Sequence, residues 1–340
     1  MTDTPSKVLS TGGREVGGLR TIAEGLREGF AELGIPAEII PPSAILSRWP
    51  ELRDPGVLKI FSTTAVFAAP FARRAICVAH GFPRPDAQGW LKTLAILASF
   101  KLVNLSRRCC LAAVSDYVAV HLRAVFNLRV DAVIHNPVQS IFAETRQATE
   151  ERVYLTYVGR LIPAKNVHRL LPAMRQMLDE DSRLRICIIG DGPQRRHLEA
   201  SFCDPRIEFT GSLDSLAVRE YLRRTRVFVS GCETEPLGIT YLEALSQGCV
   251  VAMPACGGGL EIAPALIGTQ IQLLPLSFHG SEVLDVLQRA AKSMSNSVSF
   301  DTYAPGAIAA KYLKCDTHCR SKAPAVCQSA RTSETGRDAH

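Results

Sequence analysis

The chain has 340 residues, 46% of them hydrophobic and 21% charged, with a formal net charge of +6 at neutral pH. These values argue against a disordered chain, and the longest apolar runs, such as 94–100, are too short to cross a bilayer. The length suits two domains, each with its own core. Because the first residues lack the apolar stretch of a secretory signal, we expect a cytoplasmic protein.

The first part of the chain, to about residue 140, alternates strand-like and helix-like runs. A helix is predicted over 19–34, where one stripe is apolar and Gly34 ends the pattern. The glycines at 11–18, just before it, let the backbone approach a ligand closely or simply form a turn. Strands are predicted over 8–10, 37–41, 57–61, 75–80, 110–115 and 132–136.

The segment 90–110 alternates apolar stretches with lysine and arginine and contains no acidic residue. Such a segment can rest on an anionic membrane surface. The alternative is an ordinary core helix with a basic outer face. The basic residues form no zinc finger or RNP motif and are not interleaved with aromatic residues, so we expect no nucleic-acid partner.

A polar stretch at 141–152 predicts an interdomain linker, after which the alternation of strand and helix restarts. Strands are predicted over 153–159, 184–190, 207–211, 226–230 and 250–254, and helices over 166–178, 193–202, 215–225 and 240–245. The predicted organisation is an N-terminal domain (1–140), the linker (141–152), a C-terminal domain (153–299), a terminal helix (300–314) and a disordered tail (315–340). Both domains are expected to be doubly wound α/β sheets.

The eleven cysteines do not indicate a disulfide framework. Cys77, Cys187 and Cys249 lie inside strand-like runs, so we read the cysteines as reduced core residues. Four side chains that can bind metal cluster near the C-terminus: Cys315, His318, Cys319 and Cys327. Their spacing matches no structural zinc pattern, so we predict no metal site.

Glu235 and Glu243 lie on either side of a predicted helix start. A helix start offers unpaired amide N–H groups and a partial positive charge to an anion. The flanking strands at 226–230 and 250–254 complete a βαβ unit, so this loop lies beyond the carboxyl end of a parallel strand, where ligands bind. Two carboxylates beside a phosphate-binding helix end suit a nucleotide-sugar. The alternative is a pair of solvated surface glutamates.

Two further loops carry residues suited to phosphate. Arg160 and Lys165 follow the strand at 153–159, so two cations can converge outside the sheet, although either residue alone could form a surface ion pair. Gly190 and Gly192 end the next strand, where they permit a tight turn beside a ligand.

These motifs occur in a fixed order along the chain: VGRL followed by KN, then IIGDGP, then IEFTG, and finally the two glutamates. Glu235 and Glu243 are separated by seven residues, and Glu243 lies in the run LEALSQGCVVA. The set resembles glycosyltransferase family 4, well over 154–261 and more loosely in the N-terminal domain. The resemblance implies the GT-B fold, in which two Rossmann-like domains face a central cleft. It also implies sugar transfer from a nucleotide-diphosphate sugar with retention of configuration and without a metal or other cofactor.

The resemblance also implies roles for single residues. Arg160 and Lys165 match the residues that hold the diphosphate, Glu235 and His80 those beside the reacting sugar, and Glu243 the residue that accepts hydrogen bonds from the ribose. We expect the first four to be catalytic. The remaining donor-binding residues would be Gly17, Gly18, Gly190, Asp191, Leu237, Gly238 and Ile239.

The leading hypothesis is a retaining, metal-independent hexosyltransferase acting on a glycan or lipid-linked acceptor in cell-surface polysaccharide synthesis. It would work in the cytoplasm or peripherally on the inner face of the membrane. Two alternatives stay open: a nucleotide-sugar-binding protein that has lost transfer, and a nucleotide-sugar epimerase of the same fold. An NAD-dependent oxidoreductase is disfavoured because no G-x-G-x-x-G opens a helix after a strand.

Overall fold

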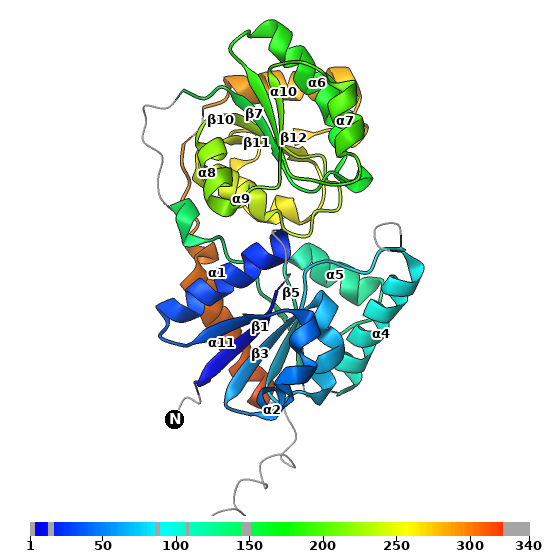
Figure 1. Cartoon of the computed structure of the whole chain (residues 1–340), viewed down its shortest axis with the longest axis vertical. Coiled ribbons are helices and arrows are strands. Elements are labelled where there is room, and N and C mark those ends of the chain that lie inside the picture. Colours follow the sequence, from blue (N-terminus) through cyan, green and yellow to red (C-terminus); the bar gives the residue numbers. More distant parts are fainter. Residues whose placement is uncertain are drawn as a thin grey trace, which may run out of the picture.

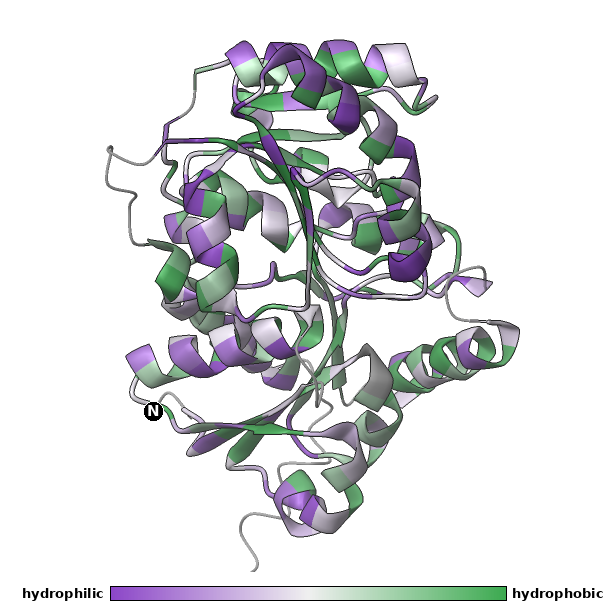
Figure 2. Ribbon diagram, turned by 45° about the horizontal axis from the view of Figure 1, so that its top comes forward, coloured by the Kyte–Doolittle hydropathy of each residue, from purple (hydrophilic) through white to green (hydrophobic). Residues whose placement is uncertain are grey.

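The computed structural model describes residues 4–12, 17–85, 89–106, 109–143, 151–294 and 296–321. The chain forms two domains, each built on a six-stranded parallel sheet covered by helices (Figure 1). Hydrophobic residues concentrate along the strands of both sheets, whereas the helices mix hydrophobic and hydrophilic positions (Figure 2). The predicted two-domain α/β architecture is confirmed.

The N-terminal sheet has the strand order β2-β1-β3-β4-β5-β6. Its strands are β1 (Lys7–Thr11), β2 (Ala37–Ile40), β3 (Val57–Ser62), β4 (Ala75–Ala79), β5 (Cys109–Ala113) and β6 (Ala132–Val133). Strands β3, β4 and β5 are buried along their whole length, which is why each is a nearly continuous apolar run. The strand order reverses between β1 and β3, and this opens a crevice at their carboxyl ends.

The α-helices that the structure describes in this domain are α1 (Gly18–Glu32), α2 (Trp49–Arg53), α4 (Trp90–Ser106) and α5 (Asp116–Ala124). Helix α1 buries the predicted apolar stripe, including Ile22, Leu26 and Phe30. It ends as predicted at Gly34, whose φ of 72° lies in the left-handed region that glycine adopts without strain. Helix α5 begins at a cap that the sequence analysis did not identify, where Ser115 accepts a hydrogen bond from the amide of Val118.

The C-terminal sheet has the order β12-β11-β10-β7-β8-β9. Its strands are β7 (Tyr154–Val158), β8 (Arg185–Ile189), β9 (Ile207–Gly211), β10 (Thr225–Val229), β11 (Val250–Pro254) and β12 (Ile271–Leu274). This is the Rossmann order, with the reversal between β7 and β10. The register pairs Leu155 with Ile186 and Val227 with Val250, so the apolar side chains of neighbouring strands pack together.

Five helices flank this sheet: α6 (Val167–Glu180), α7 (Arg195–Ser201), α8 (Ser215–Arg223), α9 (Ile239–Ser246) and α10 (Gly280–Lys292). The first four lie where the sequence predicted them. Helix α10 and strand β12 were not predicted. Val283, Val286 and Leu287 of α10 are buried in the same core cluster as Leu170 and Met174 of α6.

The terminal helix α11 (Pro305–Ser321) returns to the N-terminal domain and packs on α1 (Figure 1). The crossing is close: a Cβ on Gly29 would lie 2.0 Å from the carbonyl oxygen of Pro305. The prediction that this helix ends at 314 and a disordered tail starts at 315 is wrong up to Ser321. Asp316, which makes the segment look polar, is buried in an ion pair with Arg74 at 2.8 Å. Residues 322–340 of the predicted tail, and 144–150 of the predicted linker, lie outside the described residues.

On the outer side of helix α4 Lys92 is exposed but apolar residues predominate, so this side is less basic than the alternative reading of 90–110 expected. Its buried side is Thr93, Ile96, Phe100 and Val103. Its outer side exposes large apolar residues: Trp90, Leu91, Leu94, Leu102 and Leu105. None of the described helices is long and apolar enough to cross a membrane. Arg107 and Arg108, part of the predicted basic character, lie outside the described residues.

The reading of all cysteines as reduced core residues needs one correction. Cys77, Cys187 and Cys249 are buried and form no disulfide, as predicted. Cys110 of β5 and Cys319 of α11, however, form a disulfide between residues 209 positions apart. The sequence analysis could not anticipate the bond because it did not place α11 against β5.

Candidate active site

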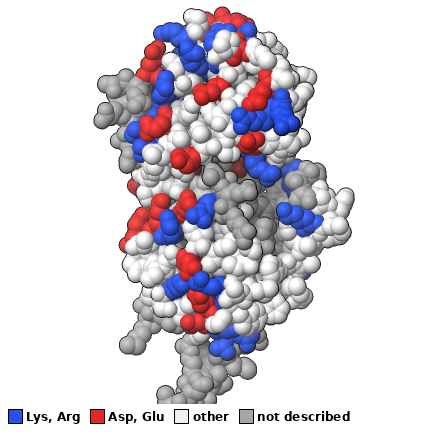
Figure 3. Space-filling model, in the orientation of Figure 1, with Lys and Arg blue, Asp and Glu red and all other residues white. Residues whose placement is uncertain are grey.

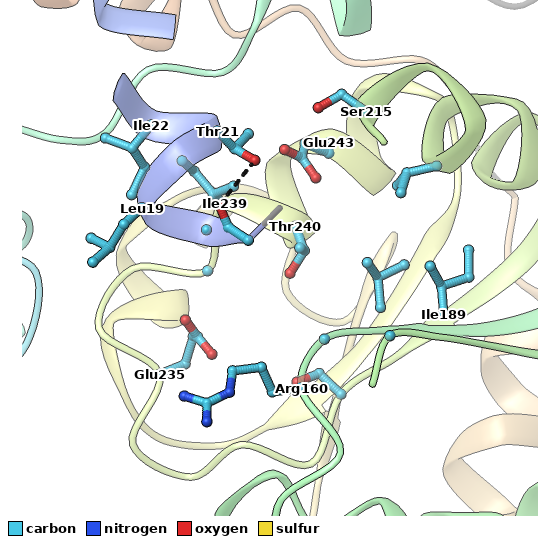
Figure 4. A pocket seen from close by; sticks show the side chains of 18 of the residues that line it. Leu19, Thr21, Ile22, Arg160, Ile189, Ser215, Glu235, Ile239, Thr240 and Glu243 are labelled. Carbon is cyan, nitrogen blue, oxygen red and sulfur yellow. Dashed lines mark hydrogen bonds between the residues drawn. The ribbon is translucent and has the colours of Figure 1, made fainter. Parts of the chain in front are cut away.

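A cavity of 550 Å³ lies between the two domains, at the carboxyl ends of the central strands. Its size suits a small-molecule ligand. All the predicted site residues line it: Gly17, Gly18, His80, Arg160, Lys165, Gly190, Asp191, Glu235, Leu237, Gly238, Ile239 and Glu243. Figure 4 shows Glu235 and Arg160 together on one side, with Glu243 apart from them beside Ser215. The structure thus brings these residues together, while their individual roles stay predictions.

Glycines allow the loops after β7 and β8 to pack against each other at the cavity wall. Gly190 has a φ of 133°, and a Cβ there would lie 1.9 Å from the carbonyl oxygen of Gly159. No other residue fits this position without moving the backbone. The contact holds Arg160 and Asp191, which follow these two glycines, at the cavity edge.

The start of α9 forms part of the cavity wall, through Gly238, Ile239 and Thr240. Gly238 precedes the helix with a φ of 85°, and a Cβ there would lie 2.4 Å from the Tyr241 ring. Among the described residues, no hydrogen bond uses the amides of Ile239 and Thr240. Gly17 and Gly18 bring the start of α1 to the same cavity from the opposite domain. Two helix N-termini therefore supply partial positive charge to one space.

The loop that carries Glu235 rests on a glycine run that the sequence analysis did not recognise. The amide of Gly258 donates to the carbonyl oxygen of Glu235 at 2.8 Å. A Cβ on Gly258 would lie 2.0 Å from the carbonyl oxygen of Pro236. Glycines in this position therefore fix the backbone beneath Glu235. The three consecutive glycines at 257–259 were the available sequence indication.

Lys165 and Glu235 form an ion pair, with 2.6 Å between Nζ and Oε2. Burial opposes the positive charge of Lys165, but the adjacent Glu235 carboxylate outweighs it and raises the pKa of the lysine. Within the described part of the chain, the guanidinium of Arg160 has no ion-pair partner. This corner of the cavity therefore holds one neutralised cation and one cation available to an anionic ligand.

Glu243 is buried, with 5% of its surface exposed, and it lines the cavity. Burial raises the pKa of its carboxyl to about 7. No hydrogen-bond donor among the described residues reaches this carboxylate. A buried carboxylate without donors costs folding free energy, and a ligand that donates hydrogen bonds to it would offset this cost.

His80 follows β4 and faces the cavity from the N-terminal domain. Burial lowers the pKa of His80 to about 4, although a side-chain hydrogen bond with Asn136 acts in the opposite direction. The ring is therefore neutral at neutral pH. Asn136 also lines the cavity and was not among the predicted site residues, although it ends the strand predicted over 132–136.

Polar contacts join the two domains beside the cavity, and none of them was predicted. The carboxylate of Glu261 accepts hydrogen bonds from the amides of Asp116 and Tyr117 at the start of α5. The Ser115 hydroxyl donates to the carbonyl oxygen of Pro236, and Arg84 donates to Thr234. The acidic side chain at a helix N-terminus favours this closed arrangement.

Comparison with known proteins supports the predicted family in the C-terminal domain. Residues 139–266 match the family model of "Glycosyl transferases group 1". Sulfoquinovosyl transferase SQD2 of Arabidopsis thaliana is 31% identical over 143 residues, which are 41% of this chain and 27% of that protein. The chain thus aligns with less than a third of this relative's length.

Solved structures resemble the whole chain. The structure of Anabaena HepE with UDP and glucose has a TM-score of 0.66 at 14% identity, covering 96% of this chain and 100% of that one. WaaG, a glycosyltransferase involved in lipopolysaccharide biosynthesis, has a TM-score of 0.63 at 14% identity, covering 97% and 100%. The chain has the GT-B fold, and its residues 139–266 are similar in sequence to the glycosyl transferases group 1 family.

Proposed function

We propose that this protein is a retaining glycosyltransferase of family 4, which transfers a hexose-type sugar from a nucleotide-diphosphate sugar to a glycan or lipid-linked acceptor in cell-surface polysaccharide synthesis. The observation that carries the proposal is the cavity between the two domains. It combines two cations, two helix N-termini and two separated carboxylates. HepE, which shares the fold, was solved with UDP and glucose bound.

The cavity supports one orientation of the donor. Arg160, Lys165 and the amides at the start of α9 suit the diphosphate, because cations and unpaired N–H groups bind phosphate oxygens. Glu243 then receives the ribose hydroxyls. Glu235 and His80 face the sugar. Diphosphate binding would draw Lys165 away from Glu235 and leave that carboxylate free to accept hydrogen bonds from sugar hydroxyls.

The reaction we propose is front-face attack, in which the acceptor hydroxyl attacks the anomeric carbon as the diphosphate leaves, and the departing phosphate receives the proton. Configuration is retained and no covalent intermediate forms on the protein. Arg160, Lys165 and the helix ends would stabilise the charge on the leaving group, which is the part a metal ion plays in other enzymes. We therefore propose a metal-independent reaction with the nucleotide-sugar as the only small-molecule requirement.

A panel of nucleotide-sugars, screened first by thermal shift and then for transfer, tests the proposal. A ligand at a hundred times its Kd stabilises the fold by about 2.7 kcal/mol. Lys165→Ala and Glu243→Ala should each abolish transfer but remain folded, whereas Lys292→Ala, at the end of α10 and away from the cavity, should be fully active. Turnover retained in both cavity variants would overturn the assignment. Donor binding with no transfer to any acceptor would instead identify a nucleotide-sugar-binding protein.

We further propose that the protein works at the inner face of the membrane, with the outer side of α4 resting on anionic lipid. Leu91 and Leu105 are 87% and 79% exposed, which is unusual for large apolar side chains. Helix α4 contains Lys92 and Lys101 and no acidic residue. Figure 3 shows basic and acidic residues interspersed over much of the visible surface. Burying such leucines in lipid is favourable by about 1.5 to 3 kcal/mol each.

Flotation with vesicles that contain anionic lipid tests the membrane contact. The wild type should float at low salt, and the double variant Leu91→Glu with Leu105→Glu should not. Leu276→Glu is the matched control, because Leu276 is also exposed (51%) but lies in the C-terminal domain. Absence of flotation by the wild type would rule out this surface, without bearing on sugar transfer.

A further inference from the structure

Three cysteines meet where the terminal helix α11 packs on the N-terminal sheet. Cys110 belongs to β5, while Cys315 and Cys319 are four residues apart on α11 and so lie on one face of that helix. The three sulfur atoms lie within 4.8 Å of one another. Cys110 and Cys315 are buried and Cys319 is partly buried.

We propose that these cysteines, in their reduced form, bind one thiophilic metal ion such as Zn²⁺. Zinc–sulfur bonds are about 2.3 Å long, so sulfur atoms that share a zinc ion lie about 3.8 Å apart. The sulfurs of Cys110 and Cys319, which are bonded to each other here, would have to separate to that spacing after reduction, whereas Cys315 already lies within 4.8 Å of both. Three protein sulfurs leave the fourth position of a tetrahedral ion to water or another small ligand. The site is distinct from the interdomain cavity, and none of the three cysteines lines that cavity.

The metal-bound and disulfide forms exclude each other. In the disulfide form, Cys110 and Cys319 share a covalent bond and Cys315 is free. A dithiol reductant would break this S–S bond: two electrons and two protons pass to Cys110 and Cys319, and the reductant becomes a disulfide. Binding of Zn²⁺ then displaces the thiol protons as the sulfurs become thiolates.

Either form would fasten α11 to the N-terminal domain. The same helix is held by the buried ion pair between Asp316 and Arg74, next to Cys315. A metal ion would therefore cross-link α11 to β5, in addition to the ion pair. It would keep α11 attached to the N-terminal domain under reducing conditions, where the disulfide is broken. Metal binding should stabilise the reduced protein, because an ion that binds only the folded chain shifts the unfolding equilibrium.

Native mass spectrometry of the full chain, reduced and oxidised, tests the proposal with Zn²⁺ as the probe. The reduced wild type should bind one ion and show a higher Tm with Zn²⁺ than without it. The oxidised wild type should bind none at this site, a comparison that needs no substitution. Co²⁺ in place of Zn²⁺ should give the thiolate charge-transfer absorption that reports sulfur ligands.

Substitutions locate the ion. Cys315→Ser keeps the pair that forms the disulfide but removes the third ligand, so the reduced variant should lose the bound ion. Cys203→Ser is the control, because Cys203 is exposed and belongs to the other domain. The proposal is overturned if the reduced wild type binds no Zn²⁺, if the oxidised form binds it equally well, or if Cys315→Ser leaves the stoichiometry unchanged.

Discussion

Glu243 makes the stability of the donor-free protein depend on pH. Its carboxyl is buried, and its pKa is raised from 4.5 to about 7. A folded-state pKa above the unfolded value means that the folded protein holds the proton more tightly. Protonation of Glu243 therefore stabilises the folded protein fully below about pH 4.5, and this stabilisation is lost as the pH rises through 7. For a pKa raised from 4.5 to about 7, the loss in the free energy of unfolding is about 3 kcal/mol.

The variant Glu243→Gln removes this titration while keeping the shape of the side chain. The free energy of unfolding of the variant, minus that of the wild type, should therefore rise by about 3 kcal/mol between about pH 4.5 and pH 8. Urea unfolding at several pH values, without nucleotide, measures this difference, and other titrating groups cancel in it. Glu235→Gln is the control: it breaks the ion pair with Lys165 but leaves Glu243 in place, so the loss of stability with rising pH that Glu243 causes should persist. A difference that stays constant across the pH range for Glu243→Gln would refute the reasoning.

Three further substitutions test the packing around the site. Gly190→Ala should destabilise the fold by about 3 kcal/mol or more in urea unfolding, because its Cβ would collide with Gly159, whereas Gly280→Ala, with open space around it, should be nearly neutral. Glu261→Gln should weaken the contact with the start of α5 by about 1 kcal/mol and increase the radius of gyration in small-angle scattering; an unchanged radius would contradict a role of Glu261 in holding the two domains together. Gly29→Ala should loosen the crossing with Pro305, seen as faster amide exchange in α11 with α10 unaffected.

The sequence predicted the parts of the fold and site that lie close together along the chain. The central strands were found because a strand buried on both faces must be apolar throughout, as in β4 and β11. The site residues Glu235, Gly238 and Glu243 belong to one strand–loop–helix unit, so their proximity follows from local geometry. Helix α10 was missed although its apolar stripe is regular, because the motifs of the family resemblance end at Glu261.

Features that depend on contacts between distant residues could not be predicted. Glu261 binds backbone amides at 116 and 117, and no residue pattern marks an amide as a partner. Gly258 supports Glu235 through a backbone contact that only the folded loop reveals. Asp316 made the terminal segment look solvated, since its partner Arg74 is 242 positions away. In each case the sequence contained a group able to make the contact, but it did not indicate which distant residue the group contacts.

The return of α11 to the N-terminal domain determines how the two domains can move. The chain crosses between them twice, and the crossings touch: the amide of Val138 donates to the carbonyl oxygen of Tyr303. Gln247 also donates to the carbonyl oxygen of Phe142 beside the first crossing. The contacts of Ser115 and Glu261 lie beside the cavity instead. The contacts of Ser115 and Glu261 are only a few hydrogen bonds. They therefore hold the two domains together less firmly than the two connecting chain segments do. The cavity should therefore open on the side of Glu261, with the paired crossings as the hinge.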